Sequence, residues 1–406
     1  MKILLLLDKY IPMPQANGVC ANHVLRAIPD AQISVVCKVN DPNIVSGKGA
    51  CGENVYSIYA PGEVPFAQRS ILRKVLYVCR HLGKALLGPV FNRKIVTSYY
   101  KVSCRIIDEN KPDLIMAVLN PLESVEALYR LKARYPRVAT MIYDLDTASK
   151  CGHGRIEERL KGVYQKRILF WEQKVFRAAD LIVHLTQFRQ HFSQKEYAEF
   201  AQKTLYQEIP LLESKKNADV QVKPLSFIYS GSFYPGLRDP ERITDIMDVV
   251  LEKSKVSLSV YTKGAPYKML LEKYKVQESV FISEYIPEEE LEVVVAETEF
   301  LLSLGNKKSQ MFPSKIVSYV SALKPIIHIY QSEDDPVNGY LKDYPVKLLL
   351  NAEDGPGYNA EQIIAFIQKD HPQIFSEQIT ALYYKNSGAY NADMILDFFK
   401  VKKNDG

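Results

Sequence analysis

The chain has 406 residues, of which 47% are hydrophobic and 24% charged, and its formal net charge is +5. Its length exceeds the roughly 250–300 residues of a single hydrophobic core, which predicts two domains. No apolar run approaches the ~20 residues of a membrane span, and the run 1–7 is too short for a signal peptide, so we expect a cytoplasmic protein. The six cysteines show no Cys-x-x-Cys or Cys/His spacing, which indicates reduced thiols.

The charge is distributed unevenly along the chain. Residues 1–205 carry 30 Lys and Arg against 18 Asp and Glu, whereas residues 206–406 carry 22 against 29. A basic half joined to an acidic half predicts that the first domain faces an anionic partner. No zinc finger, RRM signature or Gly/Arg-rich segment is present, so we do not expect that partner to be nucleic acid.

The first half alternates strand and helix signals. Residues 2–7 form a continuous apolar run that is typical of a strand buried on both faces, and a Pro/Asn/Gly loop then leads into a helix over 20–27. Further strands are expected over 32–38, 55–59, 113–118, 139–143 and 181–185, with helices over 124–135 and 157–179. This alternation predicts βαβ units and a parallel sheet.

The second half repeats the alternation after a polar segment. Strands are expected over 225–230, 256–261, 280–282, 300–304 and 325–330, and helices over 240–253, 267–274, 287–297, 314–323 and 381–400. The predicted architecture is α/β, with two Rossmann-like doubly wound parallel-sheet domains facing across a cleft. The predicted division is a domain over 1–205, a linker over 206–224, a domain over 225–385, and a C-terminal helix over 386–406 that crosses back. No Gly-x-Gly-x-x-Gly or Walker motif occurs, which excludes a dinucleotide dehydrogenase and a P-loop enzyme.

The most informative segment is the loop that follows residue 304. It ends in Pro313, Ser314 and Lys315, where a helix is expected to begin. Orphan backbone N–H groups and the positive end of a helix dipole attract anions, and a lysine adds a mobile charge. The segment therefore predicts a pyrophosphate site.

Two other loops follow the first strand of each domain. In the second domain, Gly231 and Ser232 offer backbone N–H groups and Arg238 suits bidentate contacts to phosphate, although Arg238 could also be a solvated flank of the helix. In the first domain, Gly18 beside Asn17 allows close approach of a ligand, or is a plain turn glycine. We predict that these residues bind the same donor.

Three motifs together resemble those of GT-B glycosyltransferases of the retaining family 4, which build bacterial polysaccharides from sugar nucleotides. YSGSFYPGLRDP (229–240) is similar to the family's Y-x-G-x-hydrophobic…R-D-P loop. FPSKIVSYVSALKPII (312–327) is similar to its P-S-K-hydrophobic-x-E-Y-x-x-x-G-K-P segment, and WEQKVFRAADLIVHLTQ (171–187) resembles the segment that closes the first domain. These pieces span most of the chain, up to about residue 330.

The resemblance implies a nucleotide-diphosphate sugar donor bound mostly by the second domain. Arg238 and Lys315 would contact its phosphates, Ser314 would donate a hydrogen bond to them, and Asn17 and Gly18 would lie near the sugar diphosphate. The resemblance also implies retaining, front-face transfer in which the leaving phosphate helps to deprotonate the acceptor. The two cations would stabilise that phosphate, so no metal or other cofactor is expected.

Two departures from the family pattern concern the donor. The glutamates that the family often spaces eight apart fall on Gln310 and Ser318. Gln310 can hydrogen-bond sugar hydroxyls, whereas Ser318 is too short for the charge-assisted ribose contact. Leu323 also replaces the glycine before Lys-Pro. These departures leave the identity of the donor open. They also leave open the alternative that the site is inactive.

Asp144 is the candidate acceptor-side residue. It follows the strand expected over 139–143 and resembles the aspartate of the family's acceptor segment, where a carboxylate binds or deprotonates a hydroxyl. Asp146 lies two residues further along the chain. The alternative is a loop-capping aspartate.

The basic charge is concentrated between residues 64 and 107. This segment contains no acidic residue and nine basic ones: Arg69, Arg73, Lys74, Arg80, Lys84, Arg93, Lys94, Lys101 and Arg105. Apolar residues from Ile71 to Leu86 repeat at helical spacing, with Arg69, Arg73, Arg80 and Lys84 on another face. This pattern predicts either a helix facing an anionic membrane, peripheral on its inner side, or a packed helix with a solvated basic face.

The sequence therefore predicts a glycosyltransferase that uses a nucleotide sugar and a glycan or polyprenyl-linked acceptor. Two rivals on the same scaffold are a sugar-nucleotide epimerase and a phosphorylase, but the expected carboxylate and histidine cluster and the lysine-bound cofactor motif are not found. A non-catalytic subunit that binds a nucleotide sugar is the remaining alternative, and Gln310 and Ser318 are its best support.

Overall fold

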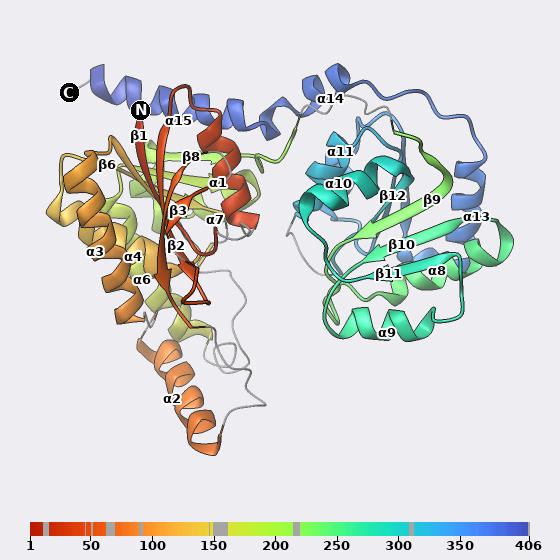
Figure 1. Ribbon diagram of the computed structural model, residues 1–406, viewed down its shortest axis with the longest axis horizontal. Coiled ribbons are helices and arrows are strands. Elements are labelled where there is room, and N and C mark those ends of the chain that lie inside the picture. Colours follow the sequence, from red (N-terminus) through yellow and green to blue (C-terminus); the bar gives the residue numbers. More distant parts are fainter. Residues whose placement is uncertain are drawn as a thin grey trace. The chain divides into compact units, whose positions relative to one another are not determined.

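The structure is a computed structural model and describes residues 1–10, 16–44, 46–49, 52–61, 70–87, 89, 92–145, 147–148, 161–213, 220–307 and 312–404. The chain divides into two compact units (Figure 1). The first consists of Met1–Pro210 with Ser387–Gly406, and the second of Leu211–Asn386. The division at Pro210 falls inside the linker predicted over 206–224, and the C-terminal segment belongs to the first unit.

The first unit is built on an eight-stranded sheet. Its strands are β1 (Lys2–Leu6), β2 (Gln32–Val39), β3 (Gly47–Lys48), β4 (Asn54–Tyr59), β5 (Leu114–Val118), β6 (Ala139–Asp144), β7 (Leu181–Leu185) and β8 (Thr204–Gln207). They follow the order β3-β4-β2-β1-β5-β6-β7-β8, and only the pair of β3 with β4 is antiparallel among the described strands. Every residue of β5 and β7 is buried, because helices cover both faces of the sheet.

The helices of the first unit form two layers. They are α1 (Ala16–Arg26), α2 (Ile71–Leu87), α3 (Arg93–Asn110), α4 (Leu122–Arg134), α6 (Lys161–Ala178), α7 (Arg189–Phe192) and α15 (Gly388–Asn404). Buried residues of α3, α4 and α6 share one core with one face of the sheet, and α1 lies across the sheet from them, beside α15 (Figure 1). A Cβ at Gly388 would lie 2.2 Å from the carbonyl oxygen of His23, so glycine permits the close contact of α15 with α1.

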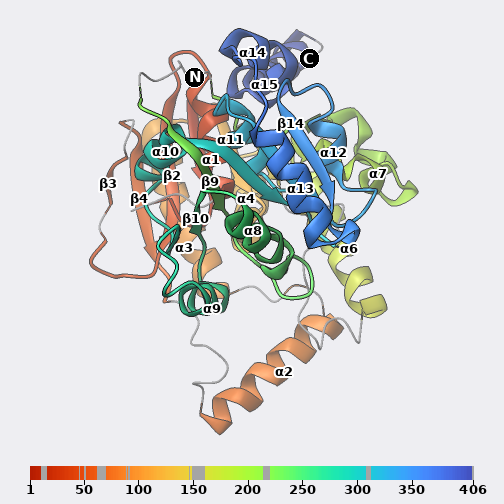
Figure 2. The same cartoon turned by 90° about the vertical axis from the view of Figure 1, so that its right-hand side faces the viewer.

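The second unit is built on a six-stranded parallel sheet. Its strands are β9 (Lys223–Ser230), β10 (Ser257–Tyr261), β11 (Val280–Ser283), β12 (Thr298–Leu304), β13 (Ile326–Tyr330) and β14 (Lys347–Asn351), in the order β11-β10-β9-β12-β13-β14. Its helices are α8 (Glu241–Lys253), α9 (Ala265–Lys273), α10 (Glu288–Glu297), α11 (Lys315–Ser321), α12 (Pro336–Tyr340), α13 (Pro356–Ile367) and α14 (Ser376–Tyr383). Helices α8 and α13 lie side by side (Figure 2).

The strand order places a switch point in each sheet. The chain moves outward from β1 through β2 and then returns to its other side at β5, and it does the same from β9 through β10 to β12. Ligands of doubly wound sheets bind at the carboxyl ends of the strands where the order reverses. The predicted α/β architecture of two doubly wound parallel sheets is confirmed.

Three local expectations differ from the structure. Helix α1 begins at Ala16, four residues ahead of the helical stretch predicted over 20–27, so Asn17 and Gly18 lie in its first turn. The helix predicted over 381–400 is broken, because α14 ends at Tyr383 and α15 begins at Gly388. In addition, β8, β14 and α3 have no counterpart among the predicted elements.

Candidate functional site

The loops after β9 and β12 are joined by the side chain of Arg238. Its Nε and Nη2 donate to Asn306 Oδ1 at 3.2 and 2.9 Å, and its Nη1 donates to the carbonyl oxygen of Ser232 at 3.4 Å. Asn306 is buried, and Arg238 is half-buried. The guanidinium group is therefore held in one orientation at the switch point of the second sheet.

The backbone of this loop is also fixed. Tyr234 and Arg238 exchange two hydrogen bonds, with Tyr234 N donating at 3.0 Å and Arg238 N at 2.7 Å. Gly236 has a φ of +78°, which favours glycine, and its N–H donates to Asp239 Oδ1 at 2.7 Å. Gly231 N donates to the carbonyl oxygen of Tyr261 at 3.0 Å.

These bonds correct one expectation. The loop was expected to offer accessible N–H groups, but the N–H groups of Gly231, Tyr234, Gly236 and Arg238 are bonded inside the protein. The hydroxyl of Ser232 lies 2.6 Å from Tyr285 Oη. The guanidinium group of Arg238 is thus the feature of this loop that is best suited to an anion.

Tyr319 brings α11 to the same edge of the sheet. Its Oη accepts a hydrogen bond from Ser230 N, the last residue of β9, at 3.0 Å. Lys315 Nζ lies 6.0 Å from the centre of the Tyr319 ring. Lys315, at the start of α11, and Arg238, in the loop after β9, therefore both lie at the carboxyl edge of the second sheet.

Two stacked aromatic side chains lie at the same edge, at the end of β9 and in the loop after it. Tyr229 stacks on Phe233 with ring centres 4.6 Å apart, and a Cβ at Gly231 would lie 3.2 Å from Tyr229 Oη. Burial raises the pKa of Tyr229, and the opposing charge of Arg238 only partly offsets it. The phenol stays protonated at neutral pH, so its proton can serve as a hydrogen-bond donor.

A buried histidine and carboxylate fasten the loop after β13, and the sequence analysis missed them. His328 Nε2 lies 3.4 Å from Asp335 Oδ2, and His328 Nδ1 lies 3.1 Å from Ser303 Oγ. Asp335 also caps α12 by accepting from Val337 N at 2.9 Å. A Cβ at Gly305 would lie only 1.8 Å from Asp335 Oδ2, so this carboxylate packs directly on the Gly305 backbone.

In the first unit, Asp144 is fully buried at the end of β6. Its Oδ2 lies 2.8 Å from Nδ1 of His184, its partner in the register of β6 with β7. The His184 ring stacks on Phe192 with ring centres 3.4 Å apart. Burial lowers the pKa of His184 well below its usual range, which favours a neutral ring beside the carboxylate. The direct contact of Asp144 with an acceptor hydroxyl stays a prediction.

The other predicted site residues are placed as follows. Asn17 is half-buried and Gly18 buried in α1 of the first unit. Ser314 immediately precedes α11, and Ser318 lies half-buried within it. Gln310 and Asp146 lie outside the described residues. The first unit thus holds Asn17, Gly18 and Asp144, and the second unit brings Arg238, Ser314 and Lys315 to one edge.

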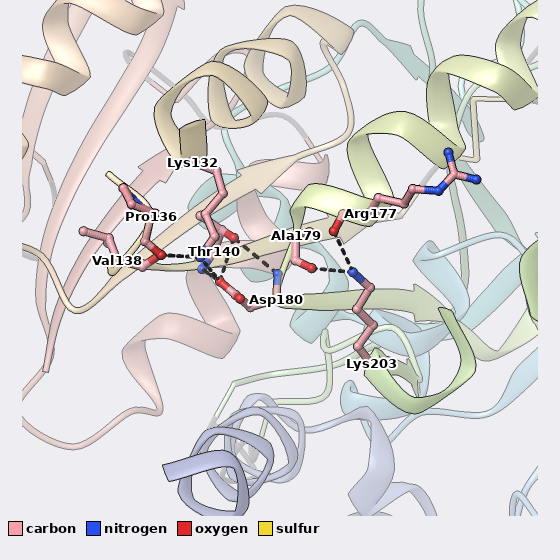
Figure 3. A network of polar contacts seen from close by, with 8 residues as sticks. All are labelled: Lys132, Pro136, Val138, Thr140, Arg177, Ala179, Asp180 and Lys203. Atoms are coloured by element: carbon pink, nitrogen blue, oxygen red, sulfur yellow. Dashed lines mark hydrogen bonds and ion pairs between the residues drawn. The ribbon is translucent and has the colours of Figure 1, made fainter. Parts of the chain in front are cut away.

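The amino edge of the first sheet shows a contrasting polar cluster (Figure 3). Asp180 Oδ2 accepts from Lys132 Nζ at 2.6 Å and from the N and Oγ1 of Thr140, both at 2.9 Å. Burial alone would raise the pKa of Asp180, but these hydrogen bonds and the lysine charge lower it. This cluster ties α4, β6 and β7 together, which is a structural role.

The described residues contain neither a metal-binding cluster nor a membrane-spanning helix. Within the described ranges, no three His, Cys, Asp or Glu side chains gather in an arrangement that could hold a metal ion. Among the described helices, none combines the length and the apolar composition needed to cross a bilayer.

The chain is similar to known proteins in structure but not detectably in sequence. A scan of protein-family models and a search of curated proteins gave no match. Among solved structures, a glycosyltransferase from Rickettsia africae aligns with a TM-score of 0.62 at 10% identity over 99% of both chains. A UDP-forming trehalose-phosphate synthase from Burkholderia xenovorans aligns at 0.59 and 10% identity, over 98% of this chain and 99% of the other.

The chain has the GT-B fold. A UDP-GlcNAc 2-epimerase from Methanocaldococcus jannaschii aligns as well, with a TM-score of 0.53 at 10% identity over 98% of this chain and 99% of the other. Because proteins that catalyse different reactions share the GT-B fold at this low identity, the likeness establishes architecture only. The reaction has to be argued from the site.

Proposed function

We propose that this GT-B protein is a glycosyltransferase that moves a sugar from a nucleotide-diphosphate sugar to a glycan or polyprenyl-linked acceptor. One observation carries the proposal. Arg238 is oriented by Asn306 and Ser232 at the switch point of the second sheet, with Lys315 on the adjoining α11. Two cations at the carboxyl edge of a Rossmann-like sheet suit a diphosphate better than they suit a neutral ligand.

The chemistry follows from the charge that develops on the leaving group. The bond between the anomeric carbon and the diphosphate oxygen breaks, and a bond to the acceptor oxygen forms on the same face of the sugar. The acceptor proton passes to the departing phosphate. Arg238 and Lys315 stabilise that phosphate as its negative charge grows, so we propose retaining transfer without a metal ion or other cofactor.

The remaining predicted residues take supporting roles in this proposal. Ser314 donates to the phosphates, and Gln310 hydrogen-bonds the sugar hydroxyls. Ser318 lines the donor site near the ribose without a charge-assisted contact, and Gly231 and Ser232 shape the donor loop. On the first unit, Asn17 and Gly18 approach the sugar diphosphate. Asp144 shapes the acceptor side through its contact with His184, which stands 2.8 Å away.

The acceptor is proposed to reach the first unit. The basic balance of residues 1–205 favours an anionic acceptor such as a polyprenyl-diphosphate-linked sugar. We further propose a cytoplasmic protein, peripheral on the inner face of a membrane, that belongs to polysaccharide biosynthesis. The resemblance to family 4 supports this assignment.

The test is a donor panel applied to the full chain. UDP-, GDP- and CMP-sugars are screened for thermal stabilisation and slow donor hydrolysis, and one nucleotide should produce both effects. Arg238→Ala and Lys315→Ala should each lower the rate of donor cleavage about 10²- to 10³-fold. A matched control is Arg242→Ala, because Arg242 pairs at 3.2 Å with Glu353 on the surface and lies outside the site. Binding of no donor, or equal behaviour of all three variants, contradicts the proposal.

The same panel separates the two alternatives. An epimerase would convert one sugar nucleotide into another without an acceptor, and product analysis by chromatography would detect it. A non-catalytic subunit would be stabilised by a nucleotide sugar without any donor cleavage. Product analysis is needed because an epimerase from Methanocaldococcus jannaschii has the same fold.

A further inference from the structure

Helix α2 carries an exposed apolar face that sugar transfer does not explain. We name it the apolar stripe: Ile71, Leu72, Val75, Leu76, Cys79, Leu82 and Leu86. Ile71 is 83% exposed, Leu72 69% and Leu76 59%. At helical spacing these residues fall within about 140° of the helix circumference, so they form one continuous surface. A contiguous exposed apolar surface on a folded protein marks an interaction site.

The neighbouring helix α3 shows that this exposure is not a general property of the segment. Both helices are basic and amphipathic, but the apolar residues Val96, Tyr99 and Ile106 of α3 are buried in the core. Helix α2 contacts α6, and it is Lys74, Tyr77 and Val78 on its other side that are half-buried. Of the two interpretations of this segment, the packed helix with a solvated basic face describes α3 and does not describe α2.

The charges beside the stripe identify the kind of surface that it fits. Arg73 and Arg80 are exposed along its border, and residues 64–107 contain no acid. Two copies of α2 packed stripe to stripe would place basic side chains against basic side chains without a compensating carboxylate. A lipid surface with anionic headgroups complements both the apolar stripe and its basic border.

We propose that α2 lies in the interface of an anionic lipid bilayer. The apolar stripe enters the boundary between headgroups and acyl chains, and Arg73 and Arg80 extend to the lipid phosphates. The basic residues predicted to face the membrane thus form the border of the contact, and the apolar residues form its centre. Arg69 lies outside the described residues, as does the side chain of Lys84. Vesicle binding by α2 and donor binding by the second unit are measured in separate assays, so either proposal can fail without the other.

Flotation of the full chain with vesicles tests the proposal. Vesicles of phosphatidylcholine alone are compared with vesicles that also contain phosphatidylglycerol, and the wild type should float only with the second kind. Leu72→Glu with Leu76→Glu should lower the partition coefficient at least about tenfold. Val276→Glu with Val293→Glu is the matched control, because these residues are 92% and 55% exposed in the second unit. Arg73→Glu with Arg80→Glu should also abolish flotation with anionic vesicles.

Cys79 provides a second measurement inside the stripe. It is exposed, whereas Cys20 and Cys37 are buried, so an environment-sensitive fluorophore can be attached to it after Cys51, Cys104 and Cys151 are changed to serine. Anionic vesicles should shift its emission to the blue, and neutral vesicles should not. Equal flotation of the wild type and the Leu72/Leu76 variant overturns the proposal. The proposal is also overturned if the chain does not bind vesicles but self-associates in sedimentation experiments, and if this self-association requires the apolar stripe. A second copy of the chain would then cover the stripe.

Discussion

A buried histidine and a carboxylate lie together near the carboxyl edge of each sheet, and the two pairs connect different parts of the fold. In the first sheet both partners are strand residues, since Asp144 ends β6 and faces His184 on β7 at 2.8 Å. In the second sheet only His328 lies on a strand, and Asp335 approaches it to 3.4 Å from the loop after β13. The first pair joins two strands, whereas the second fastens a loop to the sheet.

This difference explains why the second edge is the better candidate for binding a charged donor. Besides Asp335, Gln331 Nε2 donates to the carbonyl oxygen of Gly305 at 2.7 Å, and Lys307 N donates to that of Leu237 at 2.8 Å. Together with the contact between Arg238 and Asn306, these bonds tie the loops after β9, β12 and β13 to one another. A site held in place before the ligand arrives loses less free energy on binding.

Crowding the second edge should produce the largest effect. In Gly305→Ala the new methyl group would lie 1.8 Å from Asp335 Oδ2 and 3.3 Å from Tyr330 Cα, so the buried Asp335 carboxylate must leave its position beside His328. We expect a loss of about 3 kcal/mol in the free energy of unfolding, measured with urea. Donor-induced thermal stabilisation should disappear as well.

Gly357→Ala is the control for this change. Gly357 lies in α13 with no atom within 4 Å of the position of its Cβ, so alanine should leave stability unchanged or raise it by about 0.5 kcal/mol. If Gly305→Ala were as stable as the wild type, the contacts of Asp335 would not stabilise the loop after β13. The proposed difference between the two sheet edges would then be wrong.

The amino edge of the first sheet supplies a structural counterpart to the proposed donor edge. Asp180→Asn removes a charged acceptor of three hydrogen bonds, from Lys132 and Thr140 (Figure 3), and should cost about 2 kcal/mol at pH 7. Because the folded pKa of Asp180 is lowered, its contribution is fully present above the unfolded pKa of about 3.9 and is lost as the pH falls through the folded value. Urea unfolding at several pH values measures this.

Two results define the role of Asp180. The difference in stability between wild type and variant should shrink in acid, and donor binding should not change at any pH. Glu199→Gln is the matched control, because Glu199 pairs with Arg177 at 2.7 Å on the surface and should contribute less than about 1 kcal/mol. A loss of donor binding in Asp180→Asn would remove the distinction between a structural edge and a binding edge.

The sequence predicted the centre of each sheet better than its borders. Strands such as β5 and β7 are buried on both faces, so they appear as continuous apolar runs. Strands β8 and β14 lie at sheet edges and are mostly half-buried, so TLYQ and KLLLN resemble loops or helix ends. The break at Gly388 depends on its contact with His23, which lies more than 300 residues away in the chain and has no local signal.

The same limit applied to the site. Arg238 was predicted because its loop follows a strand and contains glycines and a basic residue. Asn306 was missed, because its role is to orient Arg238, and that role appears only when β9 and β12 are neighbours. His184 was missed because its partner Asp144 is set by strand register across 40 residues.

Removing the support of Arg238 should weaken donor binding without unfolding the protein. Asn306→Ala deletes the acceptor for Nε and Nη2, which lie 3.2 and 2.9 Å from it, and we expect the donor Kd to rise about tenfold. Isothermal titration with the preferred nucleotide measures this. In the background of Arg238→Ala the Asn306 change should have little further effect, because both changes remove one interaction. Additive losses would show that Asn306 acts on the donor independently of Arg238.

The pair in the first sheet gives the smallest effect and the most specific one. Because burial lowers the folded pKa of His184, the unfolded chain binds one more proton once the pH drops below about 6.5. Stability should therefore be highest above that pH and fall by up to about 1.4 kcal/mol per pH unit below it, and His184→Asn should flatten this slope. If the imidazole were instead charged by Asp144, 2.8 Å away, its folded pKa would be raised, and stability would increase as the pH fell toward 6.5 and level off below that pH. The sign of the slope, measured by urea unfolding between pH 5 and pH 8, thus decides whether His184 on β7 lies beside Asp144 on β6 as a neutral ring or as its ion-pair partner.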